Sequence, residues 1–263
     1  MRIIFFGSTT DSVLVLEKLP LPDIVAVVTQ PPKPAGRKQI LTPTPVETWA
    51  EKKHIPVFTR PPQETFDLII SASYGEKIPM ELIKSARYGG LNVHPSLLPR
   101  WRGGDPVPWA IVTGDTDTGV SVVTLSEKFD QGEIIAQTKI PVSHTDVSPL
   151  LRTKLFRIGA DLLVDAISKK HFHGTPQETT GYPYAKRLTR DDGFELWEKL
   201  SDPKESGRIN RKFRAFHPWP GLWTRVNGKR LKILAFDTTP ITVQLEGKKP
   251  VSWEQFKNAY LAS

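Results

Sequence analysis

The sequence predicts an α/β protein, with a doubly wound, mostly parallel sheet in its first part and a smaller domain in its second. Apolar, strand-like runs over residues 2–6 and 24–28 flank a segment of helical spacing at residues 11–19. This β-α-β order favours a parallel sheet with right-handed crossovers. The chain has 263 residues, of which 38% are hydrophobic, so it is long and apolar enough for one large domain or two smaller ones.

Local patterns predict the other elements of the first domain. Thr44 is a candidate N-cap, Pro45 takes the first helical position and Glu47 follows the cap by three residues, so a helix is expected over residues 44–53. The apolar spacing of residues 147–168 predicts a long helix that closes the domain. Further strands are expected at 55–58, 66–71, 91–94, 119–125 and 134–142, helices at 79–84 and 106–112, and a Pro/Gly-rich basic loop at 29–42.

A linker separates the two predicted domains. Residues 169–186 are rich in His, Gly, Pro and Thr, which is typical of a connecting segment. We therefore expect a first domain over residues 1–172, a linker over 173–190 and a second domain over 191–263. In the second domain, helices are expected at 192–200, 209–216 and 253–262, and strands at 231–236 and 240–246.

Composition excludes several kinds of chemistry. The chain has no cysteine, so it can form neither a disulfide nor a thiolate metal site. No G-x-G-x-x-G follows the first strand, so a nicotinamide cofactor is not indicated. His171 and His173 lack an evident carboxylate partner, and we expect no metal site. No apolar run approaches membrane-spanning length; we expect a cytoplasmic protein.

The positive charge is concentrated in the second half of the chain. The formal net charge is +8, of which residues 1–173 contribute +2 and residues 174–263 contribute +6. From Arg208 to Lys232 there are eight basic residues and no acidic residue. A solvated basic face and a contact with a polyanion are equally compatible with this run.

Residues 91–104 contain the most informative stretch of the sequence. Asn92 and His94 are two residues apart at the end of a predicted strand, so their side chains lie on the same face. Pro95 and Pro99 end the strand and prevent a helix. An open α/β sheet places its binding crevice at the carboxyl ends of its strands. There, an amide and an imidazole can stabilise an oxyanion and transfer a proton.

The segments around this strand resemble those of folate-dependent formyltransferases. Ser96-Leu97-Leu98-Pro99, followed by Arg102-Gly103, is similar to their S-L-L-P-x-x-R-G signature, and Thr118-Gly119-Val120 with Asp130-Gln131-Gly132 is similar to their T-G-V … D-x-G segment. The resemblance implies that Asn92, His94 and Asp130 are the catalytic residues. It also implies a co-substrate, 10-formyltetrahydrofolate, with no tightly bound cofactor and no metal. The residues implied in folate binding are Ser96, Leu97, Leu98, Pro99, Tyr74 and Gly75.

The resemblance extends to features of those family members that act on tRNA. Residues 29–37, T-Q-P-P-K-P-A-G-R, are similar to the loop that enters the end of the acceptor stem, and residues 214–224 are similar to the start of a C-terminal tRNA-binding domain. The second domain is therefore expected to be a truncated OB-like, α+β domain. Because only two strands are expected in it, they cannot close a barrel. The residues implied in tRNA binding are Arg37, Lys38, Arg208, Arg211, Lys212 and Arg214.

The identity of the formyl acceptor stays open between two substrates. Methionine esterified to initiator tRNA fits the basic loop and the basic second domain, and would assign the protein to translation initiation. A nucleotide-linked amino sugar is the alternative, because sugar N-formyltransferases share the Asn/His/Asp core. A third hypothesis, an inactive relative that only binds folate or RNA, is disfavoured by the intact Asn92, His94 and Asp130. We expect a monomer with no membrane partner.

Overall fold

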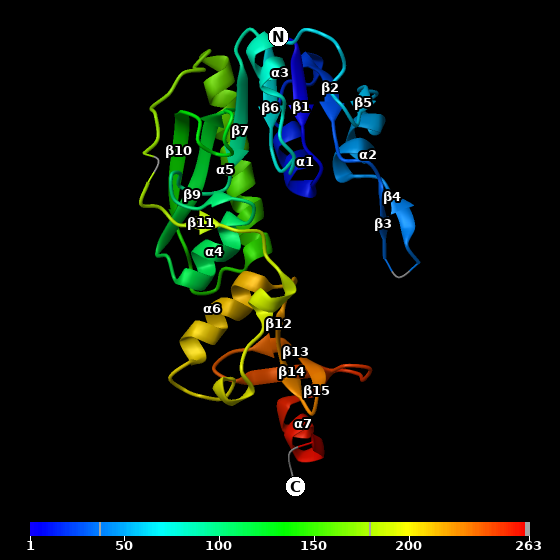
Figure 1. The fold of residues 1–263 in the computed structure, drawn as a ribbon, viewed down its shortest axis with the longest axis vertical. Helices are drawn as coiled ribbons and strands as arrows, with labels where there is room; N and C mark the ends of the chain where they lie inside the picture. The colour runs from blue at the N-terminus through cyan, green and yellow to red at the C-terminus, as the bar shows by residue number, and fades with distance from the viewer. Residues whose placement is uncertain (37, 179, 261–263) are drawn as a thin grey trace. The chain divides into compact units, whose positions relative to one another are not determined.

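The computed structural model describes residues 1–36, 38–178 and 180–260, and its course can be followed in Figure 1. The chain folds into two compact units. Unit 1 comprises residues 1–104, 118–140 and 152–185, and unit 2 comprises residues 105–117, 141–151 and the chain from 186 onward. No helix in the described part of the chain is both long and apolar enough to cross a membrane.

Unit 1 is built on a seven-stranded sheet of order β10-β9-β7-β6-β1-β2-β5. The pairs from β5 to β7 are parallel, whereas β9 runs antiparallel to β7. The predicted doubly wound, mostly parallel sheet is therefore confirmed. Its strands are β1 (Ile3–Phe6), β2 (Ile24–Val28), β5 (Val57–Phe58), β6 (Leu68–Ser71), β7 (Gly90–His94), β9 (Asp117–Thr124) and β10 (Ile134–Pro141).

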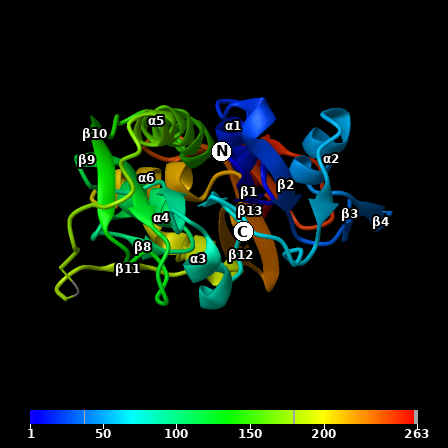
Figure 2. The ribbon, with the colours of Figure 1, turned by 90° about the horizontal axis from the view of Figure 1, so that it is seen from above.

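Helices cover both faces of this sheet. Figure 2 shows α1 and α5 on one side and α3 on the other. The expected N-cap of α2 is present, since the Thr44 hydroxyl accepts from the backbone N–H of Glu47 and the Glu47 carboxylate accepts from the backbone N–H of Thr44. The helices are α1 (Thr10–Leu16), α2 (Pro45–Lys52), α3 (Met80–Ser85) and α5 (Ser148–Ser168).

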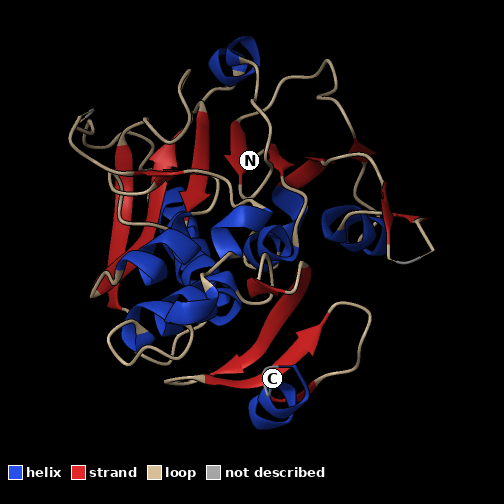
Figure 3. Cartoon of the chain, turned by 60° about the horizontal axis from the view of Figure 1, so that its bottom comes forward, coloured by secondary structure: helices blue, strands red, loops and turns tan. Residues whose placement is uncertain are grey.

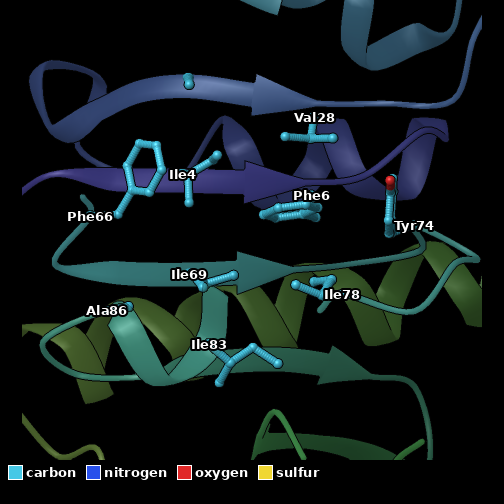
Figure 4. Packing of buried hydrophobic residues seen from close by; sticks show 10 residues of the cluster. Ile4, Phe6, Val28, Phe66, Ile69, Tyr74, Ile78, Ile83 and Ala86 are labelled. Carbon is cyan, nitrogen blue, oxygen red and sulfur yellow. The ribbon is translucent and has the colours of Figure 1, made fainter. Parts of the chain in front are cut away.

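The core of unit 1 follows from strand alternation. Every residue of β1 is buried, which is expected of a central parallel strand covered on both faces. Ile4 and Phe6 point to the side of the sheet that α3 covers, where they pack with Ile69 and Ile83 (Figure 4). Tyr74 completes this cluster with its ring edge-on to Phe6. This packing keeps the carboxyl ends of β1, β6 and β7 side by side.

Two short ribbons in unit 1 were not expected. The segment predicted as a loop at 29–42 contains an antiparallel hairpin of β3 (Lys33–Ala35) and β4 (Ile40–Thr42), which projects beyond the sheet (Figure 1). The second ribbon joins β8 (Arg102–Gly103) in parallel to β11 (Tyr184–Ala185). β11 lies inside the predicted linker, so this linker is in part an ordered element of unit 1.

Unit 2 contains a four-stranded antiparallel sheet of order β12-β13-β14-β15, shown in Figure 3. The expectation of only two strands was wrong. The first missed strand begins at the end of segment 214–224, where no strand was predicted, and the second has only two residues. The strands are β12 (Leu222–Val226), β13 (Lys229–Phe236), β14 (Pro240–Leu245) and β15 (Val251–Ser252).

Two helices of unit 2, α6 (Ser206–Phe216) and α7 (Trp253–Tyr260), share one apolar core with its sheet. α6 contributes Ile209, and α7 contributes Trp253 and Phe256. The third helix of this unit is α4 (Pro106–Thr113), which lies against α6. Burial of these large side chains supplies most of the driving force for folding such a small sheet.

The helix predicted over residues 192–200 is absent. Two short 3-10 turns, Arg190–Gly193 and Trp197–Lys199, take its place. Between them the chain is extended, because the backbone N–H of Glu195 donates to the carbonyl of Trp223 at 2.8 Å. Tertiary pairing with β12 therefore overrides the local helical pattern.

The extended segment places Glu195 in a buried ion cluster. Its Oε2 accepts from Arg208 Nη1 at 2.8 Å and from Lys212 Nζ at 3.2 Å. Burial alone would raise the pKa of Glu195, but these two cations outweigh it and hold the pKa below its usual value. The carboxylate therefore stabilises the fold in its ionised form.

Glu195→Gln is expected to change how the stability of the protein depends on pH. A lowered carboxyl pKa contributes stability above about pH 4.3, the usual value, and that stability is lost as the pH falls through the lowered pKa. In the variant, unfolding free energies from urea titrations should therefore be lower at pH 7 and fall less steeply below about pH 5. Glu254→Gln, which removes an exposed carboxylate of α7, is the control. Parallel pH curves for the Glu195 variant and the native chain would contradict this role.

Candidate active site

The end of β7 brings Asn92 and His94 to one face of the sheet. β7 lies between β6 and β9, and its last residues pair with β9 so that Asn92 lies opposite Val123 and His94 opposite Ser121. His94 is buried and Asn92 is half-buried. The i, i+2 spacing therefore has the predicted consequence, a shared face at the carboxyl end of a central strand.

The imidazole of His94 is fixed by two contacts. Its Nε2 lies 3.0 Å from the carbonyl oxygen of Trp101, and because a carbonyl only accepts, this nitrogen carries the proton. Its Nδ1 lies 3.4 Å from Oδ1 of Asp130. Of the two ring nitrogens, only Nδ1 can therefore gain or lose a proton without breaking the bond to Trp101.

Asp130 comes from the loop between β9 and β10 and completes the constellation. Its Oδ1 also lies 3.5 Å from Nδ2 of Asn92, and its Oδ2 accepts from the backbone N–H of Gly103 at 2.9 Å. The side chain is only 11% exposed. Asp130 has φ of 57°, a left-handed conformation that a residue with a side chain adopts at a cost. The amide, the imidazole and the carboxylate thus converge, although the carboxylate lies 38 residues after the amide in the sequence.

The predicted folate segment, Ser96 to Pro99, is held in place by hydrogen bonds from β9 and β10. Ser121 donates through Oγ to the carbonyl of Ser96 at 2.6 Å and accepts from the N–H of Leu98 at 3.1 Å. Gln137 donates to the carbonyl of Leu98 at 2.8 Å. Leu98 is buried and is joined to Pro99 by a cis peptide bond. The hydrogen bonds from Ser121 and Gln137 thus hold this segment as an ordered turn directly after His94.

Tyr74 and Gly75, the other residues implied in folate binding, follow β6. The ring of Tyr74 is buried against Phe6, and burial raises the pKa of its hydroxyl. Gly75 has φ of 84°, which explains the need for glycine at this turn. Both residues lie at the same edge of the sheet as Asn92, since β6 is parallel to and paired with β7.

Sequence reasoning did not find three polar side chains that organise the site. Ser121 and Gln137 brace the turn after His94, and Gln177 contacts the loop of Asp130. A polar residue within the apolar run of β9 was the available signal for Ser121. Gln177 has no comparable signal, because it lies in a segment interpreted as a linker.

Arg102, which follows the Ser96–Pro99 segment, forms its hydrogen bonds to the described residues within unit 1. Its side chain is buried and donates to Oε1 of Gln177 through Nε and Nη2, at 3.2 and 2.7 Å, and to the carbonyl of Glu178 at 2.6 Å. Arg102 therefore braces loops of unit 1.

Of the two residues of unit 1 implied in tRNA binding, Lys38 lies in the turn between β3 and β4. Lys38 is exposed, and Arg37 lies outside the described residues. Ile40 and Leu41 on β4 are exposed as well, at 62% and 67%. A projecting hairpin with apolar and basic side chains is suited to contact a partner rather than to pack on its own sheet.

The four α6 residues implied in tRNA binding all have contacts within unit 2. Arg208 and Lys212 surround Glu195, and Lys212 also donates to the carbonyl of Phe194. Arg214 donates to the carbonyl of Asp146 at 2.7 Å. Arg211 packs against the end of α4, with its buried Nε lacking a hydrogen-bond partner among the described residues. All four residues are half-buried, and Arg208, Lys212 and Arg214 have polar partners within unit 2.

The fold and this site correspond to a known class of enzyme. The formyl transferase family matches residues 1–167, which include Asn92, His94 and Asp130, and the formyl transferase C-terminal domain matches residues 203–242. Between the two matches, residues 168–202 are uncovered.

Comparison with similar proteins shows to which family of formyl transferases the chain belongs. The chain is 38% identical over 252 residues to methionyl-tRNA formyltransferase of Halalkalibacterium halodurans, covering 89% of this chain and 77% of the relative. It is 37% identical over 264 residues to methionyl-tRNA formyltransferase of Gluconobacter oxydans, covering 95% and 84%. The chain therefore belongs to the methionyl-tRNA formyltransferase family.

Solved structures confirm the fold. The N-formyltransferase from Helicobacter canadensis, in complex with folinic acid and dTDP-3-aminofucose, superposes with a TM-score of 0.68 at 16% identity and covers 96% of this chain and 98% of that one. HypX from Aquifex aeolicus superposes with a TM-score of 0.64 at 19% identity, over 99% of this chain and 49% of that one.

Proposed function

We propose that the protein transfers a formyl group from 10-formyltetrahydrofolate to the α-amino group of methionyl initiator tRNA, for translation initiation. The convergence of Asn92, His94 and Asp130 at the carboxyl end of β7 is the observation that carries this proposal. Identity of 36–38% to methionyl-tRNA formyltransferases over about nine-tenths of the chain supports the choice of acceptor. The folate is a co-substrate that leaves after each turnover.

In the proposed reaction, the amine attacks the formyl carbon and forms a tetrahedral alkoxide. Nδ2 of Asn92 donates a hydrogen bond to the developing oxyanion. The proton lost by the amine passes to Asp130, directly or through Nδ1 of His94, which lies 3.4 Å from that carboxylate. Collapse of the intermediate breaks the bond from carbon to N10, and N10 takes up the proton that Asp130 accepted. The products are the formylated amine and tetrahydrofolate.

The bond between His94 and Trp101 assigns each ring nitrogen a separate role. Nε2–H stays on the backbone carbonyl and orients the ring. Nδ1 is left for proton exchange with Asp130 and the reactants. The ordered turn from Ser96 to Pro99 would hold the pterin beside these groups, and positioning of the two reactants accounts for a large share of the rate.

We further propose that unit 2 contacts tRNA through β12 and β13 rather than through α6. Arg225, Lys229 and Lys232 on this hairpin are exposed. Of the α6 cations, Arg208, Lys212 and Arg214 are half-buried and have partners within their own unit. Exposed cations can bind phosphates, and so release their counterions, without breaking contacts within the protein. A monomer acting in the cytoplasm is part of this proposal.

A formyl-transfer assay tests the acceptor directly. Purified protein with 10-formyltetrahydrofolate and charged initiator tRNA is expected to yield formylmethionyl-tRNA, and a nucleotide-linked 3- or 4-amino sugar offered in parallel should yield no product. The amino sugar is the alternative acceptor. Formylation of the sugar without formylation of the tRNA would overturn the proposed acceptor while leaving the catalytic residues in place.

Charge removal on the β12–β13 hairpin should weaken tRNA binding and its salt dependence together. The variant carries Lys229→Ala and Lys232→Ala. The slope of log K against log [salt] is negative, and we expect its magnitude to fall by about 1 for each tRNA phosphate that the variant no longer neutralises. Filter binding across a salt series measures both quantities. Lys18→Ala, which removes an exposed lysine of unit 1, is the control. An unchanged slope in the double variant would place the phosphate contacts elsewhere.

A further inference from the structure

Part of the segment between the two family matches is built into the active site. Ile134 and Thr175 form a β-bridge with N···O distances of 2.8 and 3.0 Å. Further along, the carbonyl of Pro183 accepts from the N–H of Trp101, and the carbonyl of Ala185 accepts from the N–H of Gly104. The segment thus contacts the strand that follows Asp130 and the loop that follows His94. The side chains of this segment, which lie outside both family matches, are therefore candidates for a role in catalysis.

We propose that Gln177 is a positioning residue that holds Asp130 for catalysis, an inference that rests on the function proposed above. Its Nε2 donates to the carbonyl of Asp130 at 2.9 Å and to the carbonyl of Gly132 at 2.7 Å. Its Oε1 accepts from Arg102. Both hydrogens of the amide are therefore used on the catalytic loop, and its oxygen is used on a buried guanidinium.

The loop needs an external support because Asp130 has a left-handed backbone. With φ of 57°, this residue has a backbone conformation that costs energy and that surrounding contacts stabilise. The two bonds from Gln177 fix the carbonyls on either side of Gln131, and so fix the direction in which the Asp130 side chain leaves the loop. That direction places one carboxylate oxygen on Gly103 N–H and the other beside His94.

The chemistry of the site requires an amide at this position. The two carbonyls accept only, whereas the Arg102 guanidinium donates only. Glutamine satisfies both because it carries a donor and an acceptor at the end of one side chain. Glutamate has the same length and satisfies Arg102, but it presents an oxygen to the two carbonyls. Gln177→Glu therefore removes the hydrogen bonds to the loop of Asp130 and keeps the pairing of residue 177 with Arg102.

Kinetics of Gln177→Glu and Gln177→Ala test the proposal. A displacement of a catalytic group by about 1 Å costs on the order of 10²-fold in rate, so we expect kcat to fall by about 10- to 100-fold in both variants. The KM for 10-formyltetrahydrofolate should stay within about twofold, since the loop of Asp130 rather than the turn after His94 is disturbed. The melting temperature of Gln177→Glu should stay near that of the native chain, because the pairing with Arg102 is kept.

Glu178→Ala is the matched control. Among the described residues, the hydroxyl of Tyr182 is the one donor to its side chain, and the backbone carbonyl that Arg102 uses is retained. We expect native kcat and KM in this variant. A native kcat in Gln177→Glu would overturn the positioning role.

Amide hydrogen exchange provides a second readout that does not depend on the substrate. In Gln177→Glu, exchange at Gly103 N–H should speed up, because its acceptor on Asp130 is displaced. Exchange at Gly104 N–H, which donates to Ala185, should not change. If the native protein formylates no acceptor, the proposed function fails, and this exchange pattern still decides whether Gln177 holds Asp130. Unchanged protection of Gly103 would contradict the inference.

Discussion

Asp130→Asn is expected to lower the kcat of formyl transfer by about 10²- to 10³-fold. The asparagine keeps the size of the side chain and can still accept from the N–H of Gly103, so the loop should keep its conformation. It cannot accept the proton of the amine, and it removes the negative charge that faces Nδ1 of His94. Single-turnover kinetics with 10-formyltetrahydrofolate and charged tRNA measure the chemical step directly.

The control for this variant is Glu127→Gln. Glu127 is an exposed carboxylate three residues away in the same loop, and its loss should leave kcat unchanged. In the proposed reaction Asn92, His94 and Asp130 serve one transition state, so their effects should not add. A double variant of His94 and Asp130 should be scarcely slower than the slower of the two single variants. Full activity of Asp130→Asn would refute the site assignment.

Gly132→Ala is expected to lower the free energy of unfolding by about 3 kcal/mol and to abolish most of the activity. A Cβ on this residue would lie 1.8 Å from the carbonyl oxygen of Thr124 and 2.5 Å from its hydroxyl oxygen. The backbone of β9 cannot move away without opening its hydrogen bonds to Glu133. The loop would shift instead, and Asp130, two residues earlier, would shift with it.

Urea denaturation and the formyl-transfer assay together measure both effects of Gly132→Ala. Gly207→Ala is the matched control, because a Cβ at this position in α6 meets no atom within 4 Å. Alanine is a better helix former than glycine, so this control should be neutral or more stable by about 0.5–1 kcal/mol. Native stability in Gly132→Ala would show that the contact between this loop and β9 is looser than the structure has it.

Local sequence patterns were sufficient for most of unit 1. Alternating and continuous apolar runs predicted its long strands, and the Thr44 capping box predicted the start of α2, because these features depend on residues close together in the chain. The same reasoning failed in unit 2 at residues 192–200. There the pairing of Glu195 with Trp223, 28 residues later in the chain, outweighs the helical spacing.

The sequence by itself determined the fold class, the family, and the position of Asn92 and His94 on one strand face, because each depends on composition, spacing or local order. Only the tertiary structure decided that Nδ1 of His94 faces Asp130, that Arg102 braces loops, and that Arg208 and Lys212 of α6 pair with Glu195. It also brought Gln177 to the catalytic loop, 47 residues away in the chain. Such contacts form when loops from separate strands meet at one sheet edge. The spacing of residues in the sequence cannot predict these contacts, because each hydrogen bond depends on a partner that the rest of the fold brings into place.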